Sequence, residues 1–202
     1  MAADKDLAAL RQRYKTDKAE VFERLSQSGS STRGVRVALQ ALARLTDRTL
    51  QELWQLAGFG PDFSLIAVGG YGRGELFPHS DVDVLLLLPD HARPDADTAL
   101  KARIEGFIGS CWDVGLEIGS SVRSVADCVD EAAKDVTVQT SLLECRLIVG
   151  RRSRFALLLQ ALADAMDPKA FFVAKSLEMR QRHQKFENTP YALEPNCKES
   201  PG

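Results

Sequence analysis

A glycine-rich turn, followed within a few residues by two carboxylates and an apolar run, constrains this chain most. Residues 68–75 read Val-Gly-Gly-Tyr-Gly-Arg-Gly-Glu, Asp81 and Asp83 follow, and residues 84–88 are all apolar. Alternate side chains of an extended strand point to one face, so Asp81 and Asp83 project together while Val82 points the other way. Because adjacent like charges repel, this arrangement is costly unless a cation lies between them.

Metal-dependent nucleotide transfer is the chemistry that fits this pattern. Carboxylate oxygens suit Mg²⁺, which also binds substrate phosphates, with Mn²⁺ as the alternative metal. Gly69 and Gly70 let the backbone approach a phosphate closely, with N–H groups available to it. We therefore predict that Asp81 and Asp83 are catalytic metal ligands and that Gly69 and Gly70 bind the nucleotide.

The spacing of these residues resembles a known signature. Gly69-Gly70, ten further residues and then Asp-Val-Asp is similar to the motif of the DNA polymerase beta-like nucleotidyltransferase superfamily. The whole string from Ala67 to Leu88 is more similar to one family within it, the bacterial PII-protein uridylyltransferase/uridylyl-removing enzymes. Three further blocks fit the same family, at residues 112–123, 140–146 and 191–198. The resemblance implies an α+β fold with a small mixed sheet and flanking helices.

Hydrophobic periodicity and turn residues predict the order of helices and strands. Ser124 and Asp127 form a capping-box pattern that predicts a helix start. The predicted strands are residues 64–68, 81–88 and 112–118. The predicted helices are residues 5–26, 35–56, 97–108, 124–133, 136–148, 153–166 and 167–186. We divide the chain into a helical segment (1–58), a nucleotidyltransferase core (59–150) and a helical segment with an irregular tail (151–202).

A third carboxylate is implied by the superfamily resemblance, on a strand next to the one that carries the pair. Alternation over residues 112–118 places Asp113 and Glu117 on the polar face of such a strand. We predict that Asp113 is the third metal ligand and favours deprotonation of the attacking hydroxyl. Glu117 shares its face and is the alternative.

Two polar residues near the turn are predicted to contact the nucleotide. Arg73 matches a basic phosphate contact of the superfamily and would brace the β- or γ-phosphate, the alternative being a solvated surface residue. Ser80 either donates to a phosphate or caps the turn before Asp81. The roles of His183, on a charged helix, and of Lys198, in a family-like block, stay open.

Composition excludes several classes of protein. A formal net charge of −2 argues against nucleic acid as the main partner. The chain has no apolar run of membrane-spanning length and no apolar signal core, so we expect a cytoplasmic protein without a membrane partner. The four cysteines lack Cys-x-x-Cys spacing and do not cluster with the three histidines, which argues against a zinc site. Cys111, Cys128 and Cys145 are typical of small buried apolar residues in a reducing cytoplasm.

The family resemblance implies a specific reaction in nitrogen regulation. It is the transfer of UMP from UTP to a tyrosine hydroxyl of a PII signalling protein, with release of pyrophosphate. Full-length family members continue with an HD-type phosphohydrolase domain. Because this chain has no His-Asp doublet, we expect it to be a fragment that lacks uridylyl removal. The alternatives are a protein adenylyltransferase of the same fold and a non-catalytic nucleotide-binding regulatory module.

Overall fold

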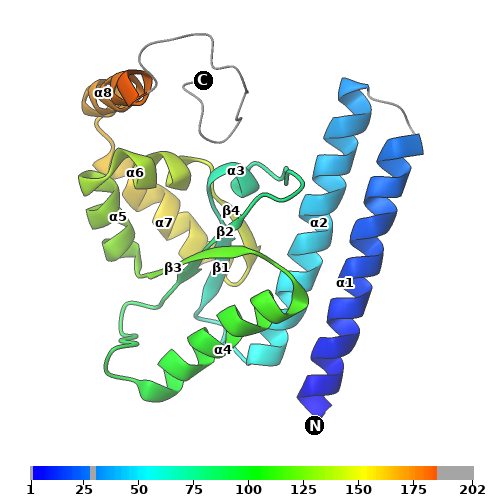
Figure 1. Cartoon of the computed structure of the whole chain (residues 1–202). Coiled ribbons are helices and arrows are strands. Elements are labelled where there is room, and N and C mark those ends of the chain that lie inside the picture. The colour runs from blue at the N-terminus through cyan, green and yellow to red at the C-terminus, as the bar shows by residue number, and fades with distance from the viewer. Residues whose placement is uncertain (1, 28–30, 186–202) are drawn as a thin grey trace.

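The computed structural model describes residues 2–27 and 31–185, in which helices surround a four-stranded mixed sheet (Figure 1). The helices are α1 (Ala2–Gln27), α2 (Thr32–Ala57), α3 (Gly69–Gly72), α4 (Thr98–Val114), α5 (Val125–Lys134), α6 (Val136–Leu143), α7 (Arg152–Ala165) and α8 (Pro168–Lys185). The strands are β1 (Ser64–Ala67), β2 (Val82–Leu87), β3 (Ile118–Arg123) and β4 (Arg146–Val149). The predicted α+β class is confirmed.

The sheet order β3-β2-β1-β4 decides which loops meet. Strand β1 pairs antiparallel with both β2 and β4, whereas β2 and β3 run parallel. The end of β1 therefore lies at the same edge of the sheet as the starts of β2 and β3. The glycine turn follows β1, and Asp81 precedes β2, so both parts of the sequence motif meet at this edge.

Helices cover the two faces of the sheet, and each face has its own apolar cluster. On one face, Val82 and Val84 pack in a cluster that extends to α1, α2 and α4. On the other face, Leu85 and Leu87 pack in a cluster that includes residues of α5, α6 and α7. Because Leu85 and Asp83 lie two residues apart on one strand, the carboxylate pair projects on the α5–α7 side.

The predicted strand at residues 112–118 is wrong. Helix α4 continues to Val114, and its buried positions follow helical spacing: Leu100, Ile104, Phe107, Cys111 and Val114. Gly115 ends the helix in the left-handed conformation (φ 96°), and its N–H donates to the carbonyls of Cys111 and Trp112. This is a glycine C-cap. The strand begins only at Ile118.

The predicted helix at residues 136–148 is wrong in its second half. Helix α6 ends at Leu143, and β4 takes the next apolar residues to the edge of the sheet beside β1. The capping box predicted at Ser124 is confirmed, because Ser124 and Asp127 bond reciprocally through their side chains and backbone N–H groups.

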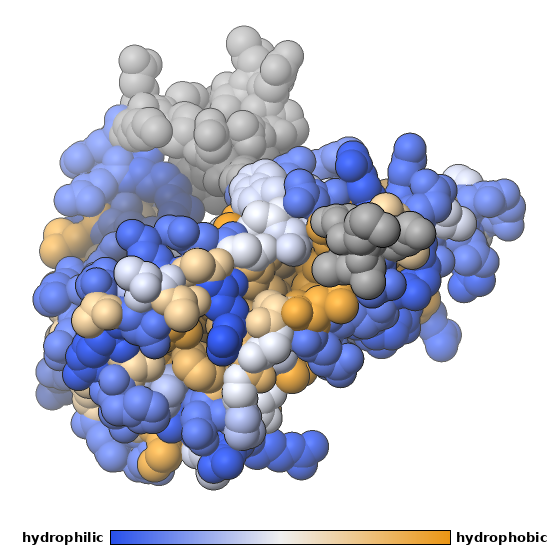
Figure 2. Space-filling view, turned by 90° about the horizontal axis from the view of Figure 1, so that it is seen from below, coloured by the Kyte–Doolittle hydropathy of each residue, from blue (hydrophilic) through white to orange (hydrophobic). Residues whose placement is uncertain are grey.

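The cysteines of the described chain behave as core residues. Cys111 and Cys128 are buried, and burial raises the pKa of each thiol to about 12. Cys145 is half-buried, and Cys197 lies outside the described residues. Among residues 2–27 and 31–185, no helix is long and apolar enough to cross a membrane. The surface seen from below is largely hydrophilic, with separate hydrophobic areas (Figure 2).

Gly72→Ala should destabilise the fold, because the α6–β4 connection packs directly on this glycine. A Cβ at Gly72 would lie 1.5 Å from the carbonyl oxygen of Glu144, so backbone must move. We expect a loss of about 3 kcal/mol in the free energy of unfolding. Gly109→Ala in α4 is the matched control: a Cβ there meets nothing within 4 Å, and we expect a gain of ~0.5–1 kcal/mol. Urea denaturation measures both, and equal stabilities would contradict the predicted contact.

Candidate active site

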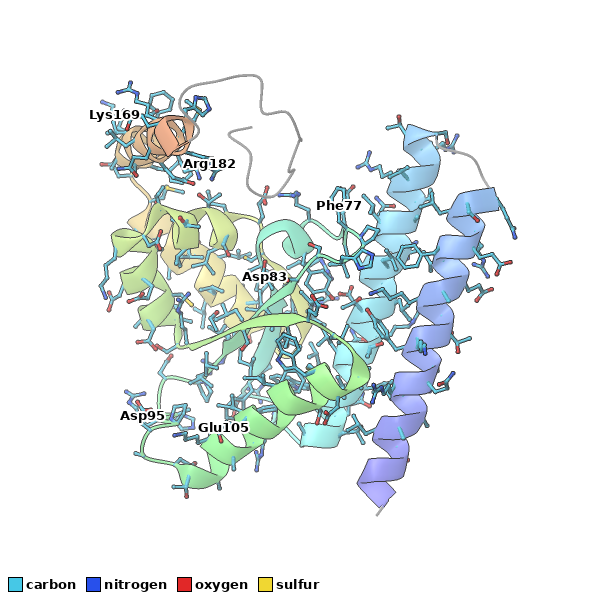
Figure 3. The ribbon with its side chains drawn as sticks, viewed as in Figure 1. Phe77, Asp83, Asp95, Glu105, Lys169 and Arg182 are labelled. Atoms are coloured by element: carbon cyan, nitrogen blue, oxygen red, sulfur yellow. The ribbon has the colours of Figure 1, made fainter. Side chains whose placement is uncertain are left out.

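The two predicted metal ligands lie together at the start of β2. Asp81 and Asp83 are exposed, whereas Val82 between them is buried, so the predicted alternation is confirmed. The backbone N–H of Val68, just before the glycine turn, donates to the carbonyl of Asp83 at 3.1 Å. This bond holds the turn beside the carboxylates, and Figure 3 shows Asp83 close to α3.

Two glycines lie against the carboxylate of Asp83. A Cβ at Gly69 would lie 3.6 Å from Oδ2, and a Cβ at Gly119 of β3 would lie 2.5 Å from Oδ1. The Cβ distance at Gly119 is shorter than any normal contact, so a side chain there would displace the carboxylate. Asp83 therefore needs glycine at position 119 to keep its carboxylate where it lies.

The glycine turn itself is a short helical turn, α3. Its N-cap, Val68, makes no side-chain capping bond, and Gly69 has a φ of 58° in the left-handed region. The first N–H groups of any helical turn have no acceptor within that turn. The predicted phosphate contacts of Gly69 and Gly70 are consistent with this geometry and stay predictions.

The third carboxylate is where the sequence and the structure disagree. Asp113 lies on the last turn of α4, not on a strand, so the alternation that selected it does not exist. Glu117 immediately precedes β3, and its carbonyl accepts a 2.8 Å bond from the N–H of Val82. Asp83 pairs with Gly119 in the parallel register. Glu117 therefore occupies the position beside Asp81 and, by strand alternation, lies on the same face as the pair.

No complete set of metal ligands is assembled in the described part of the chain. Among residues 2–27 and 31–185, no three His, Cys, Asp or Glu side chains lie close enough together to hold a metal ion. Asp113 thus does not form a ligand cluster with Asp81 and Asp83. Glu117 lies beside Asp81 in the strand register, but its side chain does not complete such a cluster either. The adjacent carboxylate pair is the part of the site that is preformed.

Arg73 and Ser80 flank the pair from the turn and from the loop. Arg73 caps α3, and its guanidinium forms an ion pair with Glu144 at the end of α6. Its Nη2 lies 3.5 Å from the position of a Cβ on Gly70, so the side chain folds back over the turn. Ser80 is exposed, and its N–H donates to the carbonyl of Phe77 at 3.1 Å. His183 lies on α8, and Lys198 lies outside the described residues.

The structure adds neighbours that the sequence motif did not identify. Ser141 of α6 has its Oγ 4.0 Å from the position of a Cβ on Gly69, and Glu144 pairs with Arg73. Both belong to the family-like block at residues 140–146, for whose residues the sequence predicts no specific role. Membership of a matching block could therefore have indicated that these residues belong to the site. The residue that each of them contacts could not be predicted from the sequence.

Two known families match separate parts of the chain. Residues 47–138 match the family described as nucleotidyltransferase domain, and this range includes the glycine turn and the Asp81–Asp83 pair. This part of the chain is similar to nucleotidyltransferase domains. Residues 170–202 match a second family, described as GlnD PII-uridylyltransferase.

Curated relatives confirm the resemblance of this chain to the uridylyltransferases. It is 57% identical over 196 residues to the bifunctional uridylyltransferase/uridylyl-removing enzyme of Cupriavidus pinatubonensis. It is 55% identical over 192 residues to the enzyme of the same name from Burkholderia orbicola. The alignments cover 96% and 95% of this chain but 22% and 21% of those relatives. The chain thus spans about a fifth of the length of the relatives that it matches.

Proposed function

We propose that this chain transfers UMP from UTP to a tyrosine hydroxyl of a PII signalling protein and releases pyrophosphate. The observation that carries the proposal is the Asp81–Asp83 pair, exposed beside a glycine turn, with Gly69 and Gly119 against the Asp83 carboxylate. The names of the relatives support the uridylyl group, and the second matching family supports PII. The reaction would serve nitrogen regulation in the cytoplasm, without nucleic acid or membrane.

The residues present fit a magnesium site, with Mn²⁺ as the alternative. Asp81 and Asp83 supply the oxygen-only ligands that Mg²⁺ prefers. We propose Glu117 as the third carboxylate in place of Asp113, because the register of β2 and β3 sets it beside Asp81. Asp81, Asp83 and Glu117 would hold the metal, which would supply positive charge against the negative charge that grows at the α-phosphorus.

The chain's own groups would hold the triphosphate for in-line attack. Backbone N–H groups of Gly69 and Gly70 would face its oxygens, and Arg73 would exchange Glu144 for the β- or γ-phosphate. Ser80 would donate to a phosphate oxygen from the loop before Asp81. The tyrosine oxygen forms a bond to the α-phosphorus while the bond from that phosphorus to the bridging oxygen breaks. Pyrophosphate leaves, and the phenolic proton passes to water.

UTP should raise the melting temperature only when a divalent cation is present. Binding at ~100 times Kd adds roughly 2.7 kcal/mol to the free energy of unfolding. For a chain of this size that corresponds to roughly 5–10 °C. Without the cation, the triphosphate faces the Asp81 and Asp83 carboxylates unscreened, so we expect almost no shift. Thermal unfolding with UTP and Mg²⁺, and again in excess chelator, measures this; equal shifts would remove the metal role of the pair.

Mass spectrometry of PII after incubation with this chain, UTP and Mg²⁺ tests the function itself. We expect PII to gain one uridylyl group on a tyrosine. Parallel reactions with ATP separate the two transferases, since modification by ATP alone would indicate a protein adenylyltransferase. Nucleotide binding without pyrophosphate release would indicate a regulatory module instead.

A further inference from the structure

Tyr71 is the one residue of the glycine turn that carries a side chain. The turn reads Gly69-Gly70-Tyr71-Gly72, so Tyr71 supplies its only side-chain contacts, beside its backbone bonds and the packing of Glu144 on Gly72. Glycine-rich backbone is conformationally free and loses more entropy on ordering than other residues. Tyr71 is 2% exposed and Gly72 is also buried, whereas Gly70 is exposed, so Tyr71 is the buried side chain that anchors the turn.

Two charged residues from distant elements hold the Tyr71 side chain. The Tyr71 hydroxyl donates to Asp47 Oδ1 on α2. Arg146, the first residue of β4, donates from Nη1 to Asp47 Oδ2 at 2.8 Å and from Nη2 to Oδ1 at 3.0 Å. The guanidinium carbon of Arg146 also lies 5.4 Å from the centre of the Tyr71 ring. The ring is thus held at its hydroxyl and over its face, with a bidentate pair that fixes direction as well as distance.

Burial and charge keep the Tyr71 hydroxyl protonated. Burial and the negative charge of Asp47 raise the pKa of the Tyr71 hydroxyl, so it remains a donor throughout the physiological pH range. The side chains of Asp47 and Arg146 are 19% and 32% exposed, which limits competition from water. Arg146 Nε is buried and has no acceptor among the described residues, whereas Nη1 and Nη2 both donate to Asp47.

We infer that Asp47, Arg146 and Tyr71 are positioning residues of the transfer reaction, an inference that rests on the proposed function. Gly69 begins the turn and approaches the Asp83 carboxylate, at 3.6 Å measured from a Cβ position. A shift of Tyr71 therefore moves the N–H groups of the turn relative to the metal ligands. Displacements of about 1 Å in a reacting geometry can cost on the order of a hundredfold in rate. The network sets this geometry without touching the substrate.

Tyr71→Phe and Asp47→Asn test the inference, with Gln51→Ala as the matched control. Gln51 lies one helical turn beyond Asp47 on α2 and also ties α2 to β4, through a 3.0 Å bond to the carbonyl of Ile148, but it has no bond to Tyr71. At saturating UTP and PII, we expect the single-turnover rate to fall about tenfold or more in the two test variants. UTP affinity should stay within about threefold, since the carboxylates still bind the metal and its phosphates. Gln51→Ala should keep the parent rate.

Amide hydrogen exchange of residues 69–74 gives a second readout that does not need activity. We expect faster exchange of this segment in Tyr71→Phe and Asp47→Asn, but not in Gln51→Ala. Parent transfer rates in the test variants would overturn the inference, and so would rate losses in all three variants that follow their melting temperatures. If the parent chain does not modify PII, the proposed function fails, but amide hydrogen exchange still tests whether Tyr71 and Asp47 anchor the turn. Parent-like protection of residues 69–74 in the two test variants would then overturn it.

Discussion

Asp81→Asn and Asp83→Asn should each abolish UMP transfer while leaving the domain folded. Both carboxylates are exposed at the start of β2, and the packing of this strand depends on Val82, Val84 and the leucines that follow. Replacing an exposed carboxylate with its amide changes stability by less than about 0.5 kcal/mol. The melting temperature should therefore move by no more than about 2 °C. The amide has one oxygen and no charge, so metal and triphosphate lose their principal ligand.

Asp95→Asn is the control for the loss of a surface carboxylate. Asp95 is exposed and lies in the loop between β2 and α4, away from Asp83 in the view of Figure 3. Pyrophosphate release and melting temperature are measured together for the three variants. Asp95→Asn should match the parent in both. Activity within a few-fold of the parent in Asp81→Asn or Asp83→Asn would show that this carboxylate is not an essential metal ligand.

The part of the site that lies close together in sequence could be predicted from the sequence. The turn, the carboxylate pair and strand β2 are contiguous, and each depends on local rules: glycine freedom, strand alternation and an apolar run. The exposure of Asp81 and Asp83 around buried Val82 follows these rules. Most helices were predicted for the same reason, since their apolar stripes and caps are local.

Strands β3 and β4 could not be predicted in the same way, because tertiary pairing decides them. Strand β3 contains Gly119, Ser120 and Ser121, which have weak intrinsic β propensity, and is ordered by parallel pairing with β2. Strand β4 has four residues, Arg146–Val149, whose apolar pattern also continues the preceding helix. A local pattern of that length does not distinguish a short strand from a helix end.

The contacts that anchor the glycine turn are the hardest part of the site to predict from the sequence. Asp47 and Arg146 are 99 residues apart, and each reads by itself as an ordinary surface charge. Their pairing exists only because α2 packs against β4. Gly119 is similar: its contact with Asp83 depends on the register between two strands separated by α4. The local motif predicts the ligands, and long-range packing determines which residues hold them in place.

Glu117→Gln should lower the chemical step by roughly a hundredfold or more, whereas Asp113→Asn should leave it within a few-fold of the parent. The N–H of Val82 donates to the Glu117 carbonyl, which fixes Glu117 next to Asp81 at the sheet edge. Asp113 is exposed on the last turn of α4 and is separated from β3 by the Gly115 cap. In the proposed site, a metal held by Asp81 and Asp83 would have Glu117, just before the adjoining strand β3, as the next carboxylate.

Single-turnover rates at saturating UTP and PII, measured with UTP affinity, decide between the two residues. UTP should bind Glu117→Gln only a few-fold more weakly, because Asp81 and Asp83 still hold a cation against the phosphates. The loss should appear in the rate, since the third carboxylate completes the charge arrangement around the reacting phosphorus. The two substitutions are matched, each replacing one exposed carboxylate with its amide, so general loss of surface charge affects both equally. A large rate loss in Asp113→Asn together with a parent rate in Glu117→Gln would assign the third carboxylate to Asp113. The end of α4 would then have to unwind toward the sheet when the substrate binds.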